Sequence, residues 1–469
     1  MELRFGTSGI RDVMGPGPGQ MNRETVRLAT LGAAGWLGGK GLVVISRDSR
    51  NNSLAFALET ARTFERCGIR ALMFEDIMPV PALSFAVRYL HADAGVMITA
   101  SHNSKEYNGY KLYGPTGGQL LPEEAAVVQE EIKAVPAEAL TPPQDEEDAY
   151  VPSYVPEEVY GAYLAAMRSA SDAPKGRAEE TEETVPCPPL SVIYTPLNGS
   201  GRRPAIETLT ADGYDVFTVP EQEWPDGDFT TTGQPNPEFA SVYRLALDYA
   251  KTRRPDVIIA TDPDCDRVGA MVRAGDEAGG PAYRLLSGND QGVLVLSYLC
   301  DTRDLSGKTF ISSFVSTPLA DRIAEAYGMN VRKTPVGFKH IAAGMDELQE
   351  DFGFAFEESN GMILGLYTRD KDGVLGARLI CQAADYYRRR GSSAAEALER
   401  VNAQYGPVFA RTVDVAVDPS APKPETKTFD YEDGSRVVVR PSGTEPKLKH
   451  YFFAPSPERL EELRKEFGV

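Results

Sequence analysis

The stretch from Leu42 to Phe74 reads LVVISRDSRNNSLAFALETARTFERCGIRALMF, and it decides the fold class of this chain. Its first four residues form a short apolar run, which predicts a buried strand. The segment from Ser53 to Cys67 has helical patterning, and the run from Ala71 to Phe74 is strand-like again. A strand, a helix and a second strand in this order predict a β-α-β unit with parallel strands.

The same alternation recurs along most of the chain. Further strand-like runs lie at Ala94–Thr99, Ser191–Tyr194, Asp256–Ala260 and Thr309–Ser313. The pattern changes after the helical stretch from Ser393 to Tyr405. Three strand-like segments with short turns and a final charged helix follow at Val408–Val417, Arg436–Val439, Leu448–Phe453 and Pro457–Phe467. This ending predicts a smaller α+β domain with an antiparallel sheet.

Three breaks divide the chain into four units. They lie near Pro136–Pro156, at a loop expected from Val272 to Pro281, and at a turn from Arg390 to Ser393. We therefore expect an α/β protein with three consecutive α/β domains, whose mixed sheets are mostly parallel, followed by the smaller C-terminal α+β domain. The expected domains cover residues 1–150, 151–282, 283–392 and 393–469.

Composition excludes several classes of protein. Of the 469 residues, 42% are hydrophobic and 25% charged, the usual mixture of a globular protein. The formal net charge of −19 disfavours non-specific nucleic-acid binding, although a local cluster of cations can still bind a small phosphorylated ligand. No apolar stretch approaches the roughly 20 residues that cross a bilayer. The acidic runs Asp145–Asp148 and Glu179–Glu183, in proline-rich surroundings, are predicted to be solvated linkers or surface loops.

The cysteines and the opening residues point to a reducing compartment. The five cysteines lie far apart and form no C-x-x-C pair, so neither a disulfide framework nor a thiolate metal site is indicated. The segment Met1–Gly6 has no apolar core, so we expect no secretory signal. These features predict a cytoplasmic protein without membrane or nucleic-acid partners.

The loop Thr99–Ser104 follows a predicted strand and contains Ser101. A serine in a loop of small and polar residues at the carboxyl end of a strand is well placed for chemistry. The alternative is an ordinary cap of the strand. Asn108 and Gly109 are typical of a tight turn, which would bring Lys111 back towards the serine.

The loop Thr261–Arg267 also follows a predicted strand. In an extended loop alternate residues project to one side, so Asp262, Asp264 and Asp266 can converge. Three hard oxygen ligands suit Mg²⁺. A solvated acidic turn is the alternative.

Three further loops are weaker when each is taken alone. Phe356–Gly361 offers acceptors for sugar hydroxyls, or else forms a cap or surface turn. Arg440–Lys447 has the composition of an anion-binding loop, or of a basic turn between strands. Phe5–Arg11 is a glycine-flanked polar loop that ends in an arginine, and an N-terminal turn would look the same. Together the five loops supply a serine, a metal loop, a hydroxyl reader and a phosphate anchor, which are the parts needed to move a phosphoryl group about a phosphosugar.

These motifs resemble, in order and over nearly the whole chain, those of the α-D-phosphohexomutase superfamily of phosphoglucomutases and phosphomannomutases. T-A-S-H-N at Thr99–Asn103 is similar to the phosphoserine loop of that superfamily, and D-P-D-C-D-R at Asp262–Arg267 to its Mg²⁺ loop. E-E-S-N at Glu357–Asn360 is similar to its sugar-binding loop, and R-P-S-G-T-E-P-K at Arg440–Lys447 to its phosphate-binding loop.

Further stretches resemble the branch of α-phosphoglucomutases that includes phosphopentomutase-like enzymes. They are Gly288–Gly292, Thr334–Lys339 and Arg369–Asp372. Two positions depart from that branch: Asn198 stands where histidine is frequent, and Asn360 stands where an aromatic residue follows the sugar-loop serine.

The resemblance implies four domains around a central cleft and a role for each matched residue. Ser101 would carry a transferable phosphate, beside Mg²⁺ held by Ser101, Asp262, Asp264 and Asp266. Arg11 and Arg267 would support the phosphate, His102 would orient the loop, and either Lys339 or Lys111 would be the general base. Glu357 and Ser359 would hold sugar hydroxyls. Arg440, Ser442, Gly443, Thr444 and Lys447 would hold the other phosphate. The C-terminal domain would close over the cleft.

The expected activity is interconversion of hexose 1-phosphate and hexose 6-phosphate, with glucose as the sugar and a hexose 1,6-bisphosphate as intermediate and activator. Mannose or pentose specificity is the nearest alternative. A Mg²⁺-dependent sugar-phosphate phosphatase and a non-catalytic sugar-phosphate sensor are the other candidates. The expected oligomeric state is a monomer or a homodimer.

Overall fold

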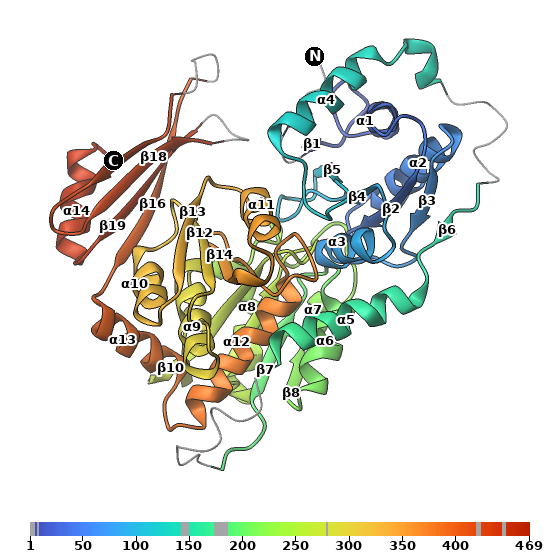
Figure 1. Ribbon diagram of the computed structural model, residues 1–469. Helices are drawn as coiled ribbons and strands as arrows, with labels where there is room; N and C mark the ends of the chain where they lie inside the picture. Colours follow the sequence, from blue (N-terminus) through green and yellow to red (C-terminus); the bar gives the residue numbers. More distant parts are fainter. Residues whose placement is uncertain are drawn as a thin grey trace.

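The computed structural model describes residues 5–6, 9–141, 150–172, 186–277, 280–418, 424–442 and 447–469. These residues form four β-sheets that follow one another along the chain, each with its own helices (Figure 1). The expected class, three α/β units with mixed sheets followed by a smaller α+β unit, is confirmed.

The first sheet has the strand order β1-β5-β4-β2-β3-β6. Its strands are β1 Ile10–Val13, β2 Leu42–Arg47, β3 Arg70–Met73, β4 Ala94–Ile98, β5 Tyr107–Tyr113 and β6 Ser153–Tyr154. Its helices are α1 Arg23–Trp36, α2 Ser53–Arg66, α3 Val80–Tyr89, α4 Pro122–Ala134 and the 3₁₀ helix η1 Ala137–Leu140. Strands β4, β2, β3 and β6 are parallel, whereas β5 and β1 are antiparallel to their neighbours.

The predicted β-α-β unit from residue 42 to residue 74 is present as β2, α2 and β3. Val43 and Ile45 belong to one buried cluster and Val44 to another. Successive side chains of a strand point to opposite faces, so β2 is buried on both. Helices cover both faces of the sheet at this strand. Because both faces are buried, the strand is a continuous apolar run and does not alternate between apolar and polar residues.

The second sheet has the order β11-β10-β9-β7-β8. Its strands are β7 Ser191–Thr195, β8 Asp215–Thr218, β9 Val257–Thr261, β10 Val268–Glu277 and β11 Gly280–Leu285. The accompanying helices are α5 Glu157–Ser171, α6 Arg202–Ala211, α7 Pro220–Glu223, η2 Ala240–Tyr243 and α8 Arg244–Arg253.

The third sheet has the order β13-β12-β14-β15. Its strands are β12 Thr309–Ser313, β13 Asn330–Thr334, β14 Phe352–Glu357 and β15 Gly361–Leu364. The helices are α9 Gly288–Thr302, α10 Pro318–Ala326, α11 Phe338–Leu348, η3 Gln349–Asp351 and α12 Gly373–Arg388. The second and third units share one large buried cluster, in which α12 packs against both.

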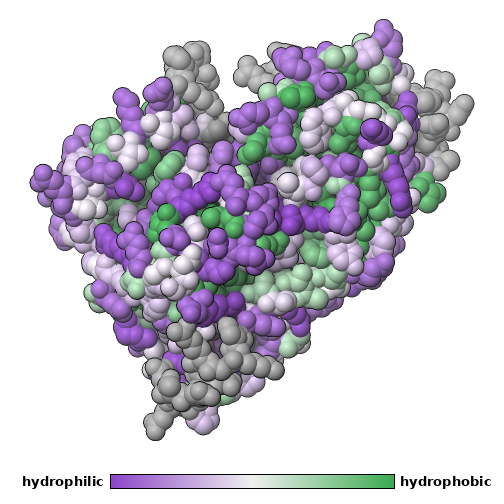
Figure 2. All heavy atoms as spheres, viewed as in Figure 1, coloured by the Kyte–Doolittle hydropathy of each residue, from purple (hydrophilic) through white to green (hydrophobic). Residues whose placement is uncertain are grey.

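The last sheet has the order β16-β19-β18-β17 and is antiparallel throughout, as expected. Its strands are β16 Phe409–Ala416, β17 Lys427–Asp430, β18 Arg436–Pro441 and β19 Lys447–Ala454, and α13 Ala394–Tyr405 and α14 Pro457–Glu466 are its helices. Figure 2 shows a notch in the molecular surface between this unit and the first.

Two local predictions are wrong. The segment Val272–Pro281, expected to be a loop, contributes to the antiparallel hairpin of β10 and β11, with an irregularity at Gly275, whose φ is +134°. Asn108 and Gly109 do not form a tight turn but lie inside β5. A Cβ atom on Gly109 would come within 2.5 Å of the carbonyl oxygen of Thr99, so this glycine is needed for close approach of two strands.

Strand β6 pairs with β3, so the first sheet extends beyond residue 150, and the second sheet extends to Leu285. The acidic runs Asp145–Asp148 and Glu179–Glu183 lie outside the described residues. Within the described ranges, no helix combines the length and the apolar character needed to cross a bilayer.

Candidate active site

Ser101 lies in the loop between β4 and β5, at the carboxyl end of β4. Its backbone is in the left-handed region, with a φ of +52°, and its side chain is buried. The hydroxyl donates a hydrogen bond of 2.8 Å to Oδ2 of Asp262 in the second unit. Its backbone N–H donates to the hydroxyl of Thr99 at 2.8 Å, which in turn donates to Asp48 at 2.6 Å. The serine is therefore held in a strained conformation that faces the acidic loop.

The three aspartates of that loop converge, as the alternation predicted. Asp262, Asp264 and Asp266 follow β9, are buried, and each offers a carboxylate oxygen within 4.8 Å of the others. Cys265 takes a φ of +49°, and the N–H of Arg267 donates to Oδ1 of Asp262 at 3.0 Å. Burial, followed by the charges of Asp264 and Asp266, raises the pKa of Asp262 well above its ordinary value.

The donor atoms of this cluster fit a divalent cation. Oδ1 of Asp264 and Oδ1 of Asp266 are both buried, and neither has a hydrogen-bond partner among the described residues. Leaving a buried charged acceptor unsatisfied is costly. Three converging carboxylates, two of which keep an Oδ1 atom without a hydrogen-bond partner among the described residues, are ligands of the kind that Mg²⁺ prefers. The solvated acidic turn is excluded because the carboxylates are buried.

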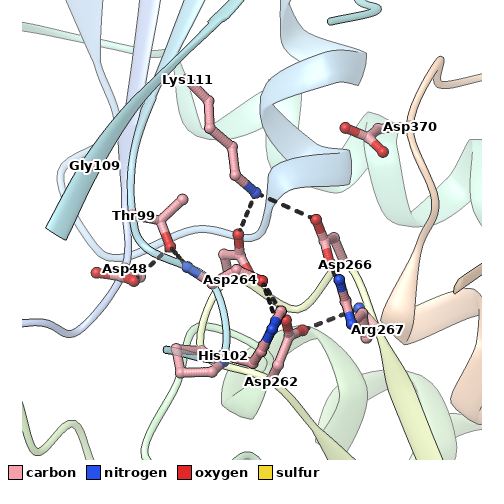
Figure 3. Close-up of polar contacts among 12 residues, drawn as sticks. Asp48, Thr99, His102, Gly109, Lys111, Asp262, Asp264, Asp266, Arg267 and Asp370 are labelled. Atoms are coloured by element: carbon pink, nitrogen blue, oxygen red, sulfur yellow. Dashed lines mark hydrogen bonds and ion pairs between the residues drawn. The ribbon is translucent and has the colours of Figure 1, made fainter. Parts of the chain in front are cut away.

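Two lysines balance the acidic cluster from its other side. The Nζ atom of Lys111 on β5 lies 2.7 Å from Oδ2 of Asp264 and 3.4 Å from Oδ2 of Asp266 (Figure 3). The Nζ atom of Lys371 lies 2.9 Å from the same oxygen of Asp266 and 3.4 Å from Asp370. Both lysines therefore bind Oδ2 atoms of the acidic cluster, while Oδ1 of Asp266 lies 3.8 Å from Nε of Arg267.

These ion pairs shift the pKa values of both partners. Burial alone would lower the pKa of Lys111, but Asp264 and Asp266 raise it above its ordinary value. Burial alone would raise the pKa of Asp266, but Lys371, Lys111 and Arg267 hold it below its ordinary range. Lys371 is a member of the site that sequence reasoning missed. It lies in the R-D-K-D run at Arg369–Asp372, for which the resemblance implies no role.

The segment Arg369–Asp372 connects three units behind the acidic cluster. The N–H of Arg369 donates to the hydroxyl of Ser84 at 2.9 Å, and Oδ2 of Asp370 accepts from Tyr113 and Gln119 of the first unit. Asp372 accepts hydrogen bonds from two N–H groups at the start of α12 and from two tyrosine hydroxyls. Lys371 thus stands on a buried, hydrogen-bonded support.

Three other predicted residues surround Ser101. Nη1 of Arg11 on β1 donates to Oδ1 of Asn103 at 3.1 Å, and Arg267 pairs with Glu238 at 3.0 Å. Nδ1 of His102 lies 3.3 Å from the hydroxyl of Ser101. Burial, together with the charges of Arg267 and Arg11, lowers the pKa of His102 well below its ordinary value, so this imidazole is neutral at pH 7. A neutral ring suits the orienting role expected of it.

The sugar-loop residues form the turn between β14 and β15. Glu357 is buried at the end of β14, and its Oε1 accepts a hydrogen bond of 3.1 Å from the N–H of Gly337. Burial raises the pKa of Glu357 to about 7. Ser359 is partly exposed in the turn. Lys339 lies two residues after Gly337, at the start of α11, and burial lowers its pKa. The start of α11 therefore contacts the sugar loop through the main chain of Gly337, while the charge that acts on Lys339 is that of Glu123 in the first unit.

The predicted phosphate anchor lies at the end of β18. Nη2 of Arg440 donates to the hydroxyl of Tyr451 at 3.2 Å, while its buried Nε has no hydrogen-bond partner among the described residues. The N–H of Ser442 donates to the carbonyl of Lys447 at 2.8 Å, which closes the loop. Gly443 and Thr444 lie outside the described residues. The charge of Arg440 reaches Glu358 of the sugar loop, where it opposes the effect of burial on the pKa of that carboxyl.

Comparisons with known proteins identify all four units. Four family models match: phosphoglucomutase/phosphomannomutase alpha/beta/alpha domain I over residues 2–138, domain II over 162–275, domain III over 287–405, and the C-terminal domain over 388–467. A phosphoglucomutase of Staphylococcus saprophyticus is 31% identical, over 99% of this chain and 92% of its own length. A probable phosphomannomutase of Haemophilus influenzae is 30% identical, over 92% of this chain and 93% of its own.

Solved structures give the same result for the fold. The crystal structure of a putative phosphomannomutase from Thermus thermophilus superposes with a TM-score of 0.77 at 25% identity, covering 99% of this chain and 98% of that one. The match extends over all four units, so their arrangement is shared and not only the separate folds.

Proposed function

The chain belongs to the phosphoglucomutase/phosphomannomutase family, and from this membership we propose that Ser101 carries the phosphoryl group that the enzyme moves between two hydroxyls of a hexose. The protein is a phosphohexomutase, an isomerase that interconverts hexose 1-phosphate and hexose 6-phosphate. The observation that carries the proposal for Ser101 is its 2.8 Å hydrogen bond to Asp262, which joins the serine loop to the acidic loop.

The reaction is a double transfer. Phosphorylated Ser101 gives its phosphoryl group to the free hydroxyl of a hexose monophosphate, and the P–O bond to serine breaks as the bond to the sugar forms. The resulting bisphosphate turns within the site and returns its other phosphate to Ser101. A free hexose 1,6-bisphosphate would prime an unphosphorylated enzyme by the same step, which makes it an activator.

The acidic loop would hold Mg²⁺ through Asp262, Asp264 and Asp266, together with an oxygen on Ser101. A bound Mg²⁺ neutralises charge on the transferred group and supplies electrostatic stabilisation of its transition state. Arg11 and Arg267, whose charges both act on His102 of the serine loop, would bind phosphoryl oxygens.

We assign the general base to Lys339. The ammonium group of Lys111 is engaged by Asp264 and Asp266, whereas burial lowers the pKa of Lys339 and so makes it easier for this side chain to lose its proton and act as a base. Lys339 also lies two residues from Gly337, which binds Glu357 of the sugar loop. It would take the proton of the attacking hydroxyl.

The remaining matched residues would bind the substrate. Glu357 and Ser359 would hold sugar hydroxyls. Arg440, Ser442, Gly443, Thr444 and Lys447 would hold the phosphate that does not react. Because this anchor lies on a separate unit, its closure would exclude water and disfavour hydrolysis.

Glucose is the preferred sugar in this proposal, since the relatives that match at 31% identity are phosphoglucomutases. Mannose is the second candidate, on the strength of the 30% identity to a probable phosphomannomutase. A coupled assay with the 1-phosphates of glucose, mannose, glucosamine and a pentose decides between them. Release of inorganic phosphate in place of isomerisation would favour a phosphatase.

The experiment that tests the phosphoserine is intact-mass analysis of the purified protein. After incubation with glucose 1,6-bisphosphate, the wild type should gain one phosphoryl group, and Ser101→Ala should gain none. A wild type that stays unmodified while fully active would overturn the assignment.

A further inference from the structure

Arg50 binds the loop that carries Ser101 more extensively than the predicted site residues do. It lies between β2 and α2 and is only 3% exposed. Its guanidinium group donates to four main-chain carbonyl oxygens, three in the loop of Ser101 and one at the first residue of β5. These are the carbonyls of Ser101, Asn103 (2.5 Å), Ser104 (2.8 Å) and Tyr107 (3.1 Å). One side chain therefore fixes the course of the backbone on the C-terminal side of the serine.

Asp48 joins this arginine to the N-terminal side of the same loop. Its Oδ2 accepts from Nε of Arg50 at 3.1 Å and from the hydroxyl of Thr99 at 2.6 Å. Its Oδ1 accepts from the N–H of Arg50 and from the hydroxyl of Ser53. Since the hydroxyl of Thr99 accepts from the N–H of Ser101, the chain Arg50–Asp48–Thr99 holds the serine from both directions.

The second unit covers the guanidinium group. The ring of Phe229 lies 5.0 Å from the Cζ atom of Arg50 and is fully buried. Beside it, Asp228 lies 3.4 Å from Lys105 of the serine loop and accepts from Asn51 at 3.2 Å. Arg50 is thus shielded from water. Charge-assisted hydrogen bonds and cation–π contacts are strongest in such a desolvated environment.

This arrangement has an identifiable task. A left-handed backbone at a non-glycine residue is strained and persists only where the surroundings over-determine it. A displacement of about 1 Å at a reacting group can cost about a hundredfold in rate. We propose that Arg50 is a positioning residue that holds the loop of Ser101 so that its hydroxyl faces Asp262. This role rests on the proposed function of Ser101 as the phosphoryl carrier.

The test replaces Arg50 with Lys, which keeps the charge but cannot reach four carbonyls, and with Met, which removes both. We expect kcat to fall about a hundredfold in each variant while KM for glucose 1-phosphate changes less than about threefold. Phosphorylation of Ser101 by glucose 1,6-bisphosphate should slow by the same factor as kcat. Phe229→Leu, which keeps the guanidinium group but removes its aromatic cover, should show a smaller loss of the same kind.

Arg27→Lys is the matched control. Arg27 is a similarly buried arginine of the first unit, but it pairs with Glu59 at 2.7 Å on the helices of that unit. This control should lower the midpoint of thermal unfolding and leave kcat unchanged. If Arg50→Met does not fold, Arg50→Lys and Phe229→Leu carry the same comparison.

The outcomes separate the two proposals. Wild-type protein that takes up a phosphoryl group, together with Arg50 variants of unchanged kcat, would overturn the positioning role alone. A rise in KM without a fall in kcat, or an equal fall in kcat for Arg27→Lys, would overturn it too. If Ser101 of the wild type never becomes phosphorylated, both the carrier role of Ser101 and the positioning role of Arg50 are overturned.

Discussion

The hydroxyl of Ser101 and Oδ2 of Asp262 are 2.8 Å apart, although the two residues belong to different sheets. Each lies in a loop at the carboxyl end of a parallel strand, β4 for the serine and β9 for the aspartate. The two units are therefore packed with corresponding edges of their sheets facing each other. This juxtaposition is what a serine nucleophile and a metal-bound phosphate require.

Replacing Asp262 with Asn should impair metal use and catalysis together. If Asp262 binds Mg²⁺ as proposed, the change removes one of three negative ligands, so we expect kcat to fall by about a hundredfold or more. The Mg²⁺ concentration that gives half-maximal activity should rise at least about tenfold. Asp248→Asn, an exposed aspartate of α8, is the control. An unchanged Mg²⁺ requirement in Asp262→Asn would show that Asp262 does not bind the metal.

Magnesium should stabilise the folded protein even without substrate. A ligand that binds only the native state adds about 2.7 kcal/mol of stability at a hundred times its Kd, so the midpoint of thermal unfolding should rise with Mg²⁺ and return with a chelator. Asp264→Asn and Asp266→Asn should show little or no such rise, because each loses the negative charge of a buried carboxylate that would bind the cation. Differential scanning fluorimetry measures the effect. An equal rise in these variants would place the cation elsewhere.

Glu357 should make stability depend on pH. Burial raises its pKa from 4.5 to about 7, so between these values the native state keeps a proton that the unfolded chain has lost. Its contribution to stability is complete below pH 4.5 and is lost as the pH rises through 7. From pH 6 to pH 8.5 the wild type should lose about 1 kcal/mol that Glu357→Gln does not lose. Thermal unfolding midpoints at the two pH values, with the exposed Glu138→Gln as control, check this. Parallel curves for Glu357→Gln and wild type would contradict it.

The two lysines should separate in their pH profiles. If Lys339 is the general base, Lys339→Met should lower kcat by about a hundredfold or more and remove the acidic limb of the kcat profile. Lys111→Met should instead change the Mg²⁺ requirement, because its ammonium group binds Asp264 and Asp266. Lys251→Met, an exposed lysine of α8, controls for the loss of a charge. An acidic limb that survives in Lys339→Met but vanishes in Lys111→Met would reverse the assignment.

Arg440→Ala should raise KM for the sugar phosphate much more than it lowers kcat. Arg440 stands on the last sheet, in contact with Tyr451 and remote in sequence from the serine loop, so it would hold the phosphate that does not react. Initial rates give KM, and intact mass gives the phosphorylation of Ser101, which should stay normal. Arg411→Ala, an exposed arginine of β16, is the control. Equal damage to binding and to phosphorylation would mean that the anchor is misassigned.

The sequence predicts the strands that carry the site because they are buried on both faces. The runs at residues 42–45 and 257–260 are apolar without alternation, and the loops that follow them hold residues of the site. The order of four motifs then identified the superfamily. Where the chain needed a glycine for packing, the same reasoning failed: Gly109 suggested a turn but instead allows β5 to lie close to β1 and β4.

Contacts between distant segments were beyond sequence reasoning. Lys371 lies 105 residues from its partner Asp266, and Arg50 about 50 residues from the loop it binds. Neither position has a periodicity or a flanking motif that states its partner. The hairpin at Val272–Pro281 was missed for another reason, since glycine and proline are typical of loops. Pro281 lies in the edge strand β11, where proline is tolerated, and Gly275 lies at the irregularity of β10.

The segment Arg369–Asp372 limits how this protein can be recombined with its relatives. Its polar groups form hydrogen bonds with Ser84, Tyr113 and Gln119 of the first unit and with Asp266 of the second. In a chimera that takes only the third unit from this protein, the buried charged groups of Arg369–Asp372 would lose their hydrogen-bond and ion-pair partners. A chimera should fold only when those partner residues are transferred together with the third unit. The first three units should therefore be exchanged as one piece, whereas the last sheet is the natural candidate for separate exchange.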